Sequence, residues 1–253
     1  MKVCASYILH YGVEWLYWSV RSVIDFVDGV YFFYTPTPSH GQSTDLPNPE
    51  TREDLLACLS PFMAKKYNIK WFDCTDGFVH EGFHREFAVN TCASDGADMV
   101  LVVDADEIWH PDSLDYNLRA AEFDDRNRTF RVGMRHFWRS LRWVCDDAAM
   151  PTRIIKPQVE DGEAYLNGRK SVYHMGYAQT PDIIQYKMSI HGHKNELRPG
   201  WFENTFMPWK PGMGDVHPTN VDFWDPRPYV DDELKTLEYL VGDHPFWNKD
   251  IIR

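Results

Sequence analysis

The sequence lacks the features that mark several specialised classes of protein. Its five cysteines are far apart and form no Cys-x-x-Cys pair; they are Cys4, Cys58, Cys74, Cys92 and Cys145. This spacing argues against a disulfide or zinc framework and favours buried, reduced thiols. No repeat or low-complexity run is visible, and no apolar stretch has the length of a transmembrane helix. The N-terminus, MKVCASYILHYG, lacks a signal-peptide pattern, so we expect a cytoplasmic protein.

Basic residues are also scarce. Lys and Arg number 26 against 38 Asp and Glu, a formal net charge of −12, and no basic block interrupts the chain. This balance disfavours broad electrostatic affinity for nucleic acid or an anionic membrane, although a local basic groove remains compatible with it. Hydrophobic residues make up 43% of the chain and aromatic residues 15%. A chain of 253 residues with that composition predicts one large folded domain.

The N-terminal half shows alternating strand and helix patterns. Apolar runs predict strands at 2–9, 30–34, 69–74 and 99–103, and helical spacing predicts helices at 13–27, 52–67 and 81–94. Pro61 should break or kink the second helix. Three successive strand, helix, strand units predict an α/β fold with a mainly parallel central sheet flanked by helices, Rossmann-like in this half.

The pattern changes after residue 110. A helix at 112–123 is followed by longer strands at 129–144, 153–157 and 171–178, of antiparallel character, and by a short helix at 181–190. Residues 198–228 are rich in Pro, Gly, Trp and Asp and should be irregular. Asp231 should cap a last helix ending at Val241. We therefore expect a single domain with three parts. Residues 1–110 would form the ligand-binding half, residues 111–228 the half that completes the binding site, and residues 229–253 a terminal helix and tail.

An acidic cluster follows the most apolar strand. In MVLVVDADEIW, residues 99–109, five apolar residues lead into Asp104, Asp106 and Glu107. Ligands of open α/β sheets bind beyond the carboxyl ends of strands. Three carboxylates there repel one another and lose solvation, a cost that a divalent cation would offset. The alternative is that these acids only form a turn and cap the next helix.

Histidines are dense in the second half. His174, His191 and His193 lie within twenty residues, and His217 follows in GDVHPTN. Imidazole and carboxylate together suit Mn²⁺, Zn²⁺ or Fe²⁺, so one of these side chains meeting Asp106 would complete a metal site. Each could equally be an ordinary hydrogen-bonded histidine.

These segments together resemble the GT-A fold glycosyltransferases, in particular the family 2-like branch. The segments that carry the resemblance are VEWLYWSVRSVIDFVDGVYFFY, REFAVNTCASDGADMVLVVDADEIW, HFW, RIIKP and HMGYAQTPDIIQYK. In that family a nucleotide-binding sheet ends in a DxD motif, often DADE, and a His-x-Gly-aromatic element lies near the donor. The resemblance implies a GT-A-like fold, a UDP- or GDP-sugar donor, and a Mn²⁺ or Mg²⁺ ion that stabilises the departing diphosphate.

The resemblance also implies roles for individual residues. Asp106 corresponds to a metal ligand and Asp104 to a ligand of the metal or the ribose, with His174 as the third ligand and His193 as the alternative. Arg85, at the start of the helix before the DADE strand, could meet a phosphate or the base.

Two segments depart from the family pattern. Its Asn-Glu pair after the first strand is replaced by His10, Tyr11 and Gly12 followed by Glu14, a candidate donor contact. Its Ser-x-Asp-Gly turn is replaced by TPTPSHGQSTD, in which Ser39 and Gly41 match in part.

The acceptor and its base are less defined. An inverting transfer needs a carboxylate to take the acceptor's proton, and the candidates by position are Glu107, Asp146 and Asp147. Four tryptophans could stack on a sugar, although burial in the core is the usual fate of Trp; they are Trp138, Trp143, Trp201 and Trp209. The acceptor could be a glycan, a protein, a small molecule or a modified nucleic-acid base. Two other functions remain open, a metal-dependent phosphoesterase or hydrolase and a non-catalytic nucleotide-sugar-binding module.

Overall fold

The N-terminal half folds as three strand, helix, strand units. The computed structural model describes residues 1–253 except 39–41, 66, 146, 148, 231–233 and 252–253. The strands are β1 (Val3–Leu9), β2 (Gly29–Tyr34), β3 (Ile69–Asp73) and β4 (Met99–Val103), and the helices between them are α1 (Val13–Val23), α2 (Arg52–Met63) and α3 (Glu81–Ser94). All four strands pair in parallel, as the sequence predicted.

The order of these strands creates a switch point in the sheet. Along the sheet they lie as β3-β2-β1-β4, so the chain moves outward from β1 to β3 and then returns to place β4 on the other side of β1. The connections that leave β1 and β4 therefore diverge, and a crevice opens at their carboxyl ends. Ligands of open α/β sheets bind at such a point.

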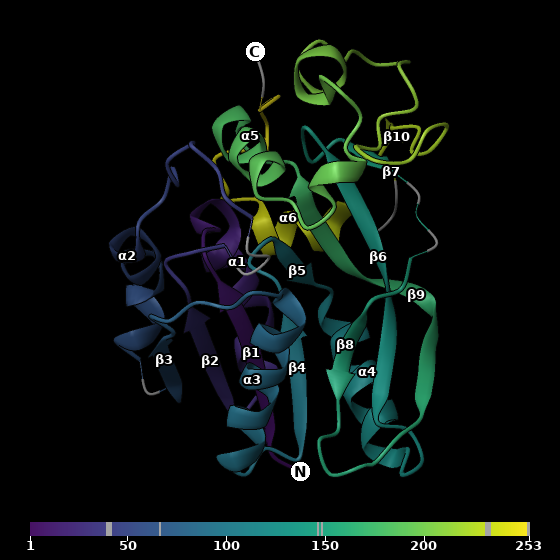
Figure 1. Cartoon of the computed structure of the whole chain (residues 1–253). Helices are drawn as coiled ribbons and strands as arrows, with labels where there is room; N and C mark the ends of the chain where they lie inside the picture. Colours follow the sequence, from purple (N-terminus) through teal and green to yellow (C-terminus); the bar gives the residue numbers. More distant parts are fainter. Residues whose placement is uncertain (39–41, 66, 146, 148, 231–233, 252–253) are drawn as a thin grey trace.

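The second half extends the same sheet with mostly antiparallel pairs. It contains β5 (Glu107–Trp109), α4 (Pro111–Phe123), β6 (Thr129–Trp138), β7 (Trp143–Cys145), β8 (Thr152–Ile155), β9 (Glu163–Tyr177), α5 (Pro181–Ser189), β10 (Arg227–Pro228) and α6 (Leu234–Val241). β8 joins β4 to β6, and β9 pairs with both β6 and β5. The predicted α/β class is confirmed, with a parallel half and a mixed half in one sheet (Figure 1). The antiparallel character predicted for the second half is wrong for β9 against β6, because these two strands pair in parallel.

Helices cover both faces of the parallel strands. Ala88, Val89 and Cys92 of α3 pack on one face, and apolar residues of α1, α2 and α4 pack on the other. β4 (Met99–Val103) is buried at every residue, as its continuous apolar run requires. Figure 1 shows α5 and the segment leading to β10 above the edge where β1 and β4 end. A cavity at this edge is lined by residues from both parts of the chain.

Two helices end differently from the predictions. The helix predicted to reach residue 27 stops at Val23, and Ile24–Phe26 continues as a 3₁₀ turn. The helix containing Pro61 ends at Met63 and continues through the proline. Pro61 cannot donate to the carbonyl of Ala57, but the Ser60 hydroxyl donates to that oxygen at 2.8 Å. This bond satisfies the carbonyl and removes one cause of a break.

The strands of the second half also differ from the predictions. The strand predicted at 129–144 is two strands, because Arg139 has a φ of 55° and reverses the chain, so that β7 folds back antiparallel on β6. The strand predicted at 171–178 begins earlier, at Glu163. β5 was not predicted, since a strand of three residues is too short to show a periodicity.

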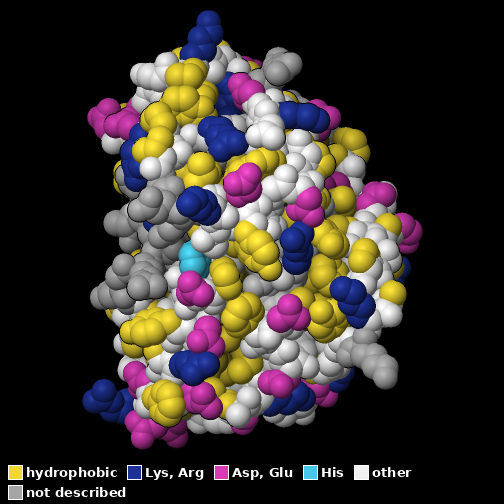
Figure 2. Space-filling model, turned by 180° about the vertical axis from the view of Figure 1, so that it is seen from behind, with side chains coloured by type: hydrophobic (Ala, Val, Ile, Leu, Met, Phe, Trp, Pro, Cys, Tyr) yellow, Lys and Arg dark blue, Asp and Glu magenta, His cyan; other side chains and the backbone are white. Residues whose placement is uncertain are grey.

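Asp231, Ser39 and Gly41 lie outside the described residues, and α6 is described from Leu234. No helix within the described part of the chain is long and apolar enough to cross a membrane. On the face opposite to Figure 1, Lys and Arg side chains are interspersed with Asp and Glu (Figure 2), as expected of a sequence without a basic block.

Candidate active site

The candidate site is a cavity of about 330 Å³ at the carboxyl ends of β1 and β4. This volume is within the range of small-molecule sites. Its walls come from the end of β1, the start of α3, the loop after β4, β9, and α5 with the segment after it. The charged and imidazole side chains that line it are His10, Glu81, Arg85, Asp104, Asp106, His174, Lys187, His191 and His193. The acidic loop predicted from the sequence is therefore part of a cavity.

Asp104 is held between two arginines. Its Oδ1 accepts a hydrogen bond from Arg85 at 2.9 Å, and its Oδ2 accepts one from Arg153 at 2.7 Å. Arg85 is also bonded to Glu81, from Nε to Oε1 at 2.7 Å. Burial acts to raise the pKa of Asp104, but the two guanidinium groups outweigh it and hold the pKa well below its usual range. Asp104 is therefore ionised, with both oxygens already engaged.

Glu107 and Arg153 form a buried ion pair below the cavity. The Glu107 side chain has no exposed surface and that of Arg153 is 9% exposed. Arg153 Nε lies 2.9 Å from Oε1 and 3.0 Å from Oε2 of Glu107, so the guanidinium contacts both carboxylate oxygens. Neither residue lines the cavity. Glu107, predicted as a candidate base, thus lies under the site, where the pair supports the loop that carries Asp104.

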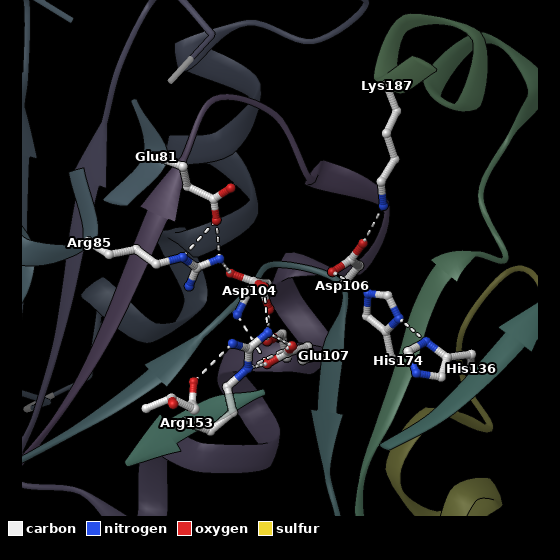
Figure 3. Close-up of polar contacts among 11 residues, drawn as sticks. Glu81, Arg85, Asp104, Asp106, Glu107, His136, Arg153, His174 and Lys187 are labelled. Atoms are coloured by element: carbon white, nitrogen blue, oxygen red, sulfur yellow. Dashed lines mark hydrogen bonds and ion pairs between the residues drawn. The ribbon is translucent and has the colours of Figure 1, made fainter. Parts of the chain in front are cut away.

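Asp106 faces the cavity with different partners. Its Oδ2 accepts a hydrogen bond from Lys187 of α5 at 3.2 Å, and its Oδ1 lies 3.7 Å from Nε2 of His174 (Figure 3). Burial acts to raise the pKa of Asp106, but the Lys187 ammonium is the largest of the opposing effects and helps to hold the pKa below its usual value. Burial lowers the pKa of His174, which favours a neutral imidazole. A carboxylate, an ammonium and a neutral imidazole thus meet at one wall.

Strand pairing brings His174 to the acidic loop. Glu107 of β5 lies opposite His174 of β9 in the antiparallel register, and Met175 N donates to the carbonyl of Asp106 at 2.7 Å. Gly176 follows two residues later and so lies on the same face of the strand. A Cβ at Gly176 would come within 2.4 Å of Cε1 of His174. The glycine of the His-x-Gly element therefore makes room for the imidazole.

A second glycine lets the loop after β1 approach the acidic loop. Gly12 has a φ of 135°, and a Cβ there would lie 2.4 Å from Cβ of Ala105, between the two aspartates. The amide of Val13 donates to the Glu50 carboxylate at 2.9 Å, and the amide of Gly12 bonds to the same oxygen. The first amides of α1 are therefore capped by a carboxylate, so a ligand phosphate would need other partners.

Several residues predicted for the site lie elsewhere. Glu14 accepts a hydrogen bond from the Thr180 amide at 3.0 Å and another from its hydroxyl, which secures the start of α5 outside the cavity. His193 lines the cavity, but it is 65% exposed and paired with Glu196. Asp147 lies behind His136, and Asp146 lies outside the described residues.

The four tryptophans considered for sugar stacking lie in or against the hydrophobic core. Trp138, Trp201 and Trp209 are buried in one aromatic cluster of the second half, and Trp143 packs against it. None of them lines the cavity. They hold the C-terminal segment on β6 and β9.

Sequence reasoning missed three residues that organise the site. Lys187, Arg153 and His136 each contact the acidic loop or His174, yet they lie 81, 49 and 38 positions from their partners. The segments RIIKP, HFW and HMGYAQTPDIIQYK contain all three. Their types and positions alone indicated no partner, because the pairing depends on which strands become neighbours.

Two side chains at the cavity are of types that could hold a metal ion. Among the described residues, no group of three His, Cys, Asp or Glu side chains is arranged to hold a metal. The predicted set of Asp104, Asp106 and His174 is therefore not assembled, because both oxygens of Asp104 are bonded to arginines. Asp106 Oδ1 and His174 Nε2 remain, 3.7 Å apart at the cavity. Two such ligands suit a cation that completes its coordination with ligand oxygens and water.

Comparisons with known proteins found similarity to solved structures alone. No family model matches the sequence, and no curated protein matches it. Among solved structures, residues 1-349 of TarS from S. aureus are 14% identical with a TM-score of 0.42, and the same fragment in complex with UDP is 16% identical with a TM-score of 0.43. Each match covers 75% of this chain and 64% of the other. A structure of S. aureus TarS is 14% identical with a TM-score of 0.43, and 39% of that chain is covered. This chain thus spans less than two thirds of the structures to which its fold is similar.

Proposed function

We propose that this chain is a glycosyltransferase that takes its sugar from a nucleotide-diphosphate sugar and binds the donor's diphosphate in the cavity. The observation that carries the proposal is the Asp106 and His174 pair with Lys187 at one wall, while Arg85 lines the same cavity beside Asp104. A diphosphate brings several negative charges, and cations aimed at it stabilise both the bound donor and the departing group. The place of the cavity, at the switch point between β1 and β4, supports the same proposal.

Asp106 and His174 would hold a Mn²⁺ or Mg²⁺ ion in this proposal. When bound, such an ion offsets the charge of the diphosphate. Lys187 contributes a positive charge at the same wall and is kept protonated: burial acts to lower its pKa, but Asp106 outweighs that effect and raises it. Its Nζ is held by Asp106 and by the Gly176 carbonyl at 3.1 Å, so it is oriented before the donor arrives.

Asp104 would have an indirect role in the proposal. Its carboxylate holds Arg85 at the cavity and Arg153 below it. Arg85 lines the cavity, and its side chain is 27% exposed. We assign Arg85 to the donor's phosphate or base, and Asp104 to the orientation of Arg85. This division explains why the two aspartates of one motif have different partners.

The experiment that tests the function is a binding panel. Thermal unfolding is measured with nucleoside diphosphates and nucleotide sugars, each with and without Mn²⁺. A ligand present at about 100 times its Kd adds about 2.7 kcal/mol to the free energy of unfolding. For a chain of this size, that gain raises the melting temperature by about 5 to 10 °C. We expect nucleotides of one base to raise the melting temperature more than the others do, and to raise it further when Mn²⁺ is present. The nucleotide sugar that stabilises the protein is then incubated with it, and the release of nucleoside diphosphate is followed.

Each alternative function has a distinct result in this panel. A hydrolase would release phosphate from simple phosphate esters with no sugar donor present. A binding module would be stabilised by the nucleotide sugar and would leave it intact with every acceptor class tested. A panel in which no nucleotide raises the melting temperature would contradict the glycosyltransferase proposal.

A further inference from the structure

A row of four side chains runs from the cavity into the second half of the molecule. Asp106 Oδ1 lies 3.7 Å from His174 Nε2, His174 Nδ1 lies 2.8 Å from His136 Nδ1, and His136 Nε2 lies 3.7 Å from Asp147 Oδ2. All four side chains are at most 18% exposed. Figure 3 shows the His174 ring between Asp106 and His136. Only the first two residues line the cavity.

The contact between the two rings restricts where their protons lie. At 2.8 Å the two Nδ1 atoms form a hydrogen bond, so one of them carries a proton and the other accepts it. A neutral imidazole carries one proton. When both rings are neutral, the ring that donates from Nδ1 therefore has a bare Nε2, and the other ring has a protonated Nε2. The two tautomers are opposite and change together.

The surroundings favour one of the two arrangements. A proton on His174 Nε2 would face Asp106, whose charge Lys187 already balances. A proton on His136 Nε2 would face Asp147, which accepts hydrogen bonds from two neutral donors, Trp224 Nε1 at 3.2 Å and the Ala149 amide at 2.7 Å. A proton is stabilised more beside the less compensated carboxylate. This comparison leaves His174 Nε2 bare and directed at the cavity.

We propose that His136 and Asp147 are positioning residues that hold His174 as the tautomer whose Nε2 lone pair faces Asp106, and so prepare the cation site. The inference rests on the proposed function only for the cation itself. Outer partners that orient a ligating histidine in this way typically change metal affinity 10- to 100-fold. The inference also gives Asp147 a role different from that of an acceptor base, because its carboxylate is directed at His136.

The first test measures Mn²⁺ binding by the electron paramagnetic resonance signal of the free ion. His136→Leu removes the acceptor for His174 Nδ1. We expect the Kd of this variant for Mn²⁺ to be about 10- to 100-fold higher than that of the parent. His136→Asn places an amide oxygen near the position of Nδ1 and should recover most of that loss. His244→Asn, which alters another buried histidine outside the cavity, should leave the Kd within about twofold while lowering stability. Equal Kd values for His136→Leu and His136→Asn would overturn the inference.

The second test reads the tautomers directly and needs no metal. Long-range ¹H–¹⁵N spectra of the ring nitrogens at pH 8 should show His174 protonated on Nδ1 and His136 protonated on Nε2. Asp147→Asn should shift the pair toward the opposite arrangement. The reverse assignment in the unchanged protein would overturn the inference. If the spectra agree and the unchanged protein binds no Mn²⁺, then the cation part of the proposed function fails and the tautomer assignment stands.

Discussion

The two sides of the acidic loop solve the same electrostatic problem in different ways. On the sealed side, Glu107 has no exposed surface and is matched by a guanidinium at two oxygens. On the open side, Asp106 has one oxygen on Lys187, and the other faces a neutral imidazole across 3.7 Å. Both carboxylates follow the same strand within four residues. The sealed side has the pairing expected of structure, and the open side has the incomplete pairing expected of a binding site.

The largest effect is expected from breaking the sealed pair. Arg153→Met leaves the buried Glu107 and Asp104 without a shared cation. Removal of one partner of a buried ion pair costs about 3 to 5 kcal/mol, and we expect a loss of that size in the free energy of unfolding measured in urea. The double variant Arg153→Met with Glu107→Leu should recover part of it. A single variant as stable as the parent would show that the pair is not structural.

A smaller effect, confined to binding, is expected on the open side. Asp106→Ala should keep the fold, because Lys187, the partner that the change leaves behind, lines the cavity and keeps its hydrogen bond to the Gly176 carbonyl. It should weaken Mn²⁺-dependent nucleotide binding about 100-fold, equivalent to about 2.7 kcal/mol, as measured by calorimetric titration. Thermal unfolding serves as the control for folding. Unchanged binding in a folded variant would contradict the assignment of the site.

The two sides should also respond differently to pH. Burial raises the pKa of Glu107 to about 7 from an ordinary 4.5, with Arg153 opposing the shift. The folded state then binds this proton more tightly than the unfolded state, so the contribution of Glu107 to stability is present below about pH 4.5 and is lost as pH rises through about 7. The pKa of Asp106 is lowered from 3.8. Its contribution to stability should therefore be lost only as pH falls below 3.8, through the lowered pKa.

The measurement is urea unfolding of the parent, Glu107→Gln and Asp106→Asn across this pH range. We expect the stability difference between parent and Glu107→Gln to change between pH 4.5 and 7. The difference for Asp106→Asn should stay constant there and change below pH 4. Parallel curves for all three proteins would remove the electrostatic contrast between the two sides.

The smallest effect concerns the room made for His174. Gly176→Ala would place a methyl group 2.4 Å from Cε1 of His174, which is too close, so the imidazole must shift from its present position. We expect about a tenfold loss of Mn²⁺ affinity, equivalent to about 1.4 kcal/mol, with little change in melting temperature. Gly96→Ala is the matched control for affinity, because a Cβ there meets nothing within 4 Å, although its φ of 84° adds backbone strain. Equal affinities in the two variants would show that the ring position does not matter.

Local sequence predicted much of the N-terminal half. Helix α3 has the predicted bounds, Glu81 to Ser94, and β4 has the predicted bounds, Met99 to Val103. Both elements were predicted from patterns within a short stretch of sequence, a helical spacing after His80 and an apolar run before Asp104. Glu107–Trp109 escaped prediction because β5 exists only through its pairing with β9. The break at Arg139 escaped it because a non-glycine residue with positive φ carries no local signal.

The sequence by itself determined that carboxylates end a buried strand at the binding edge of an α/β sheet. Only the tertiary structure decided their separate roles. Arg153, Lys187 and His174 come from β8, α5 and β9, and their distances from Asp104 and Asp106 depend on the strand order and on the β5–β9 register. The physical reason is that solvation and charge pairing act over a few ångströms in space, whatever the separation along the chain. Sequence patterns report neighbours along the chain, and the site is made of neighbours in space.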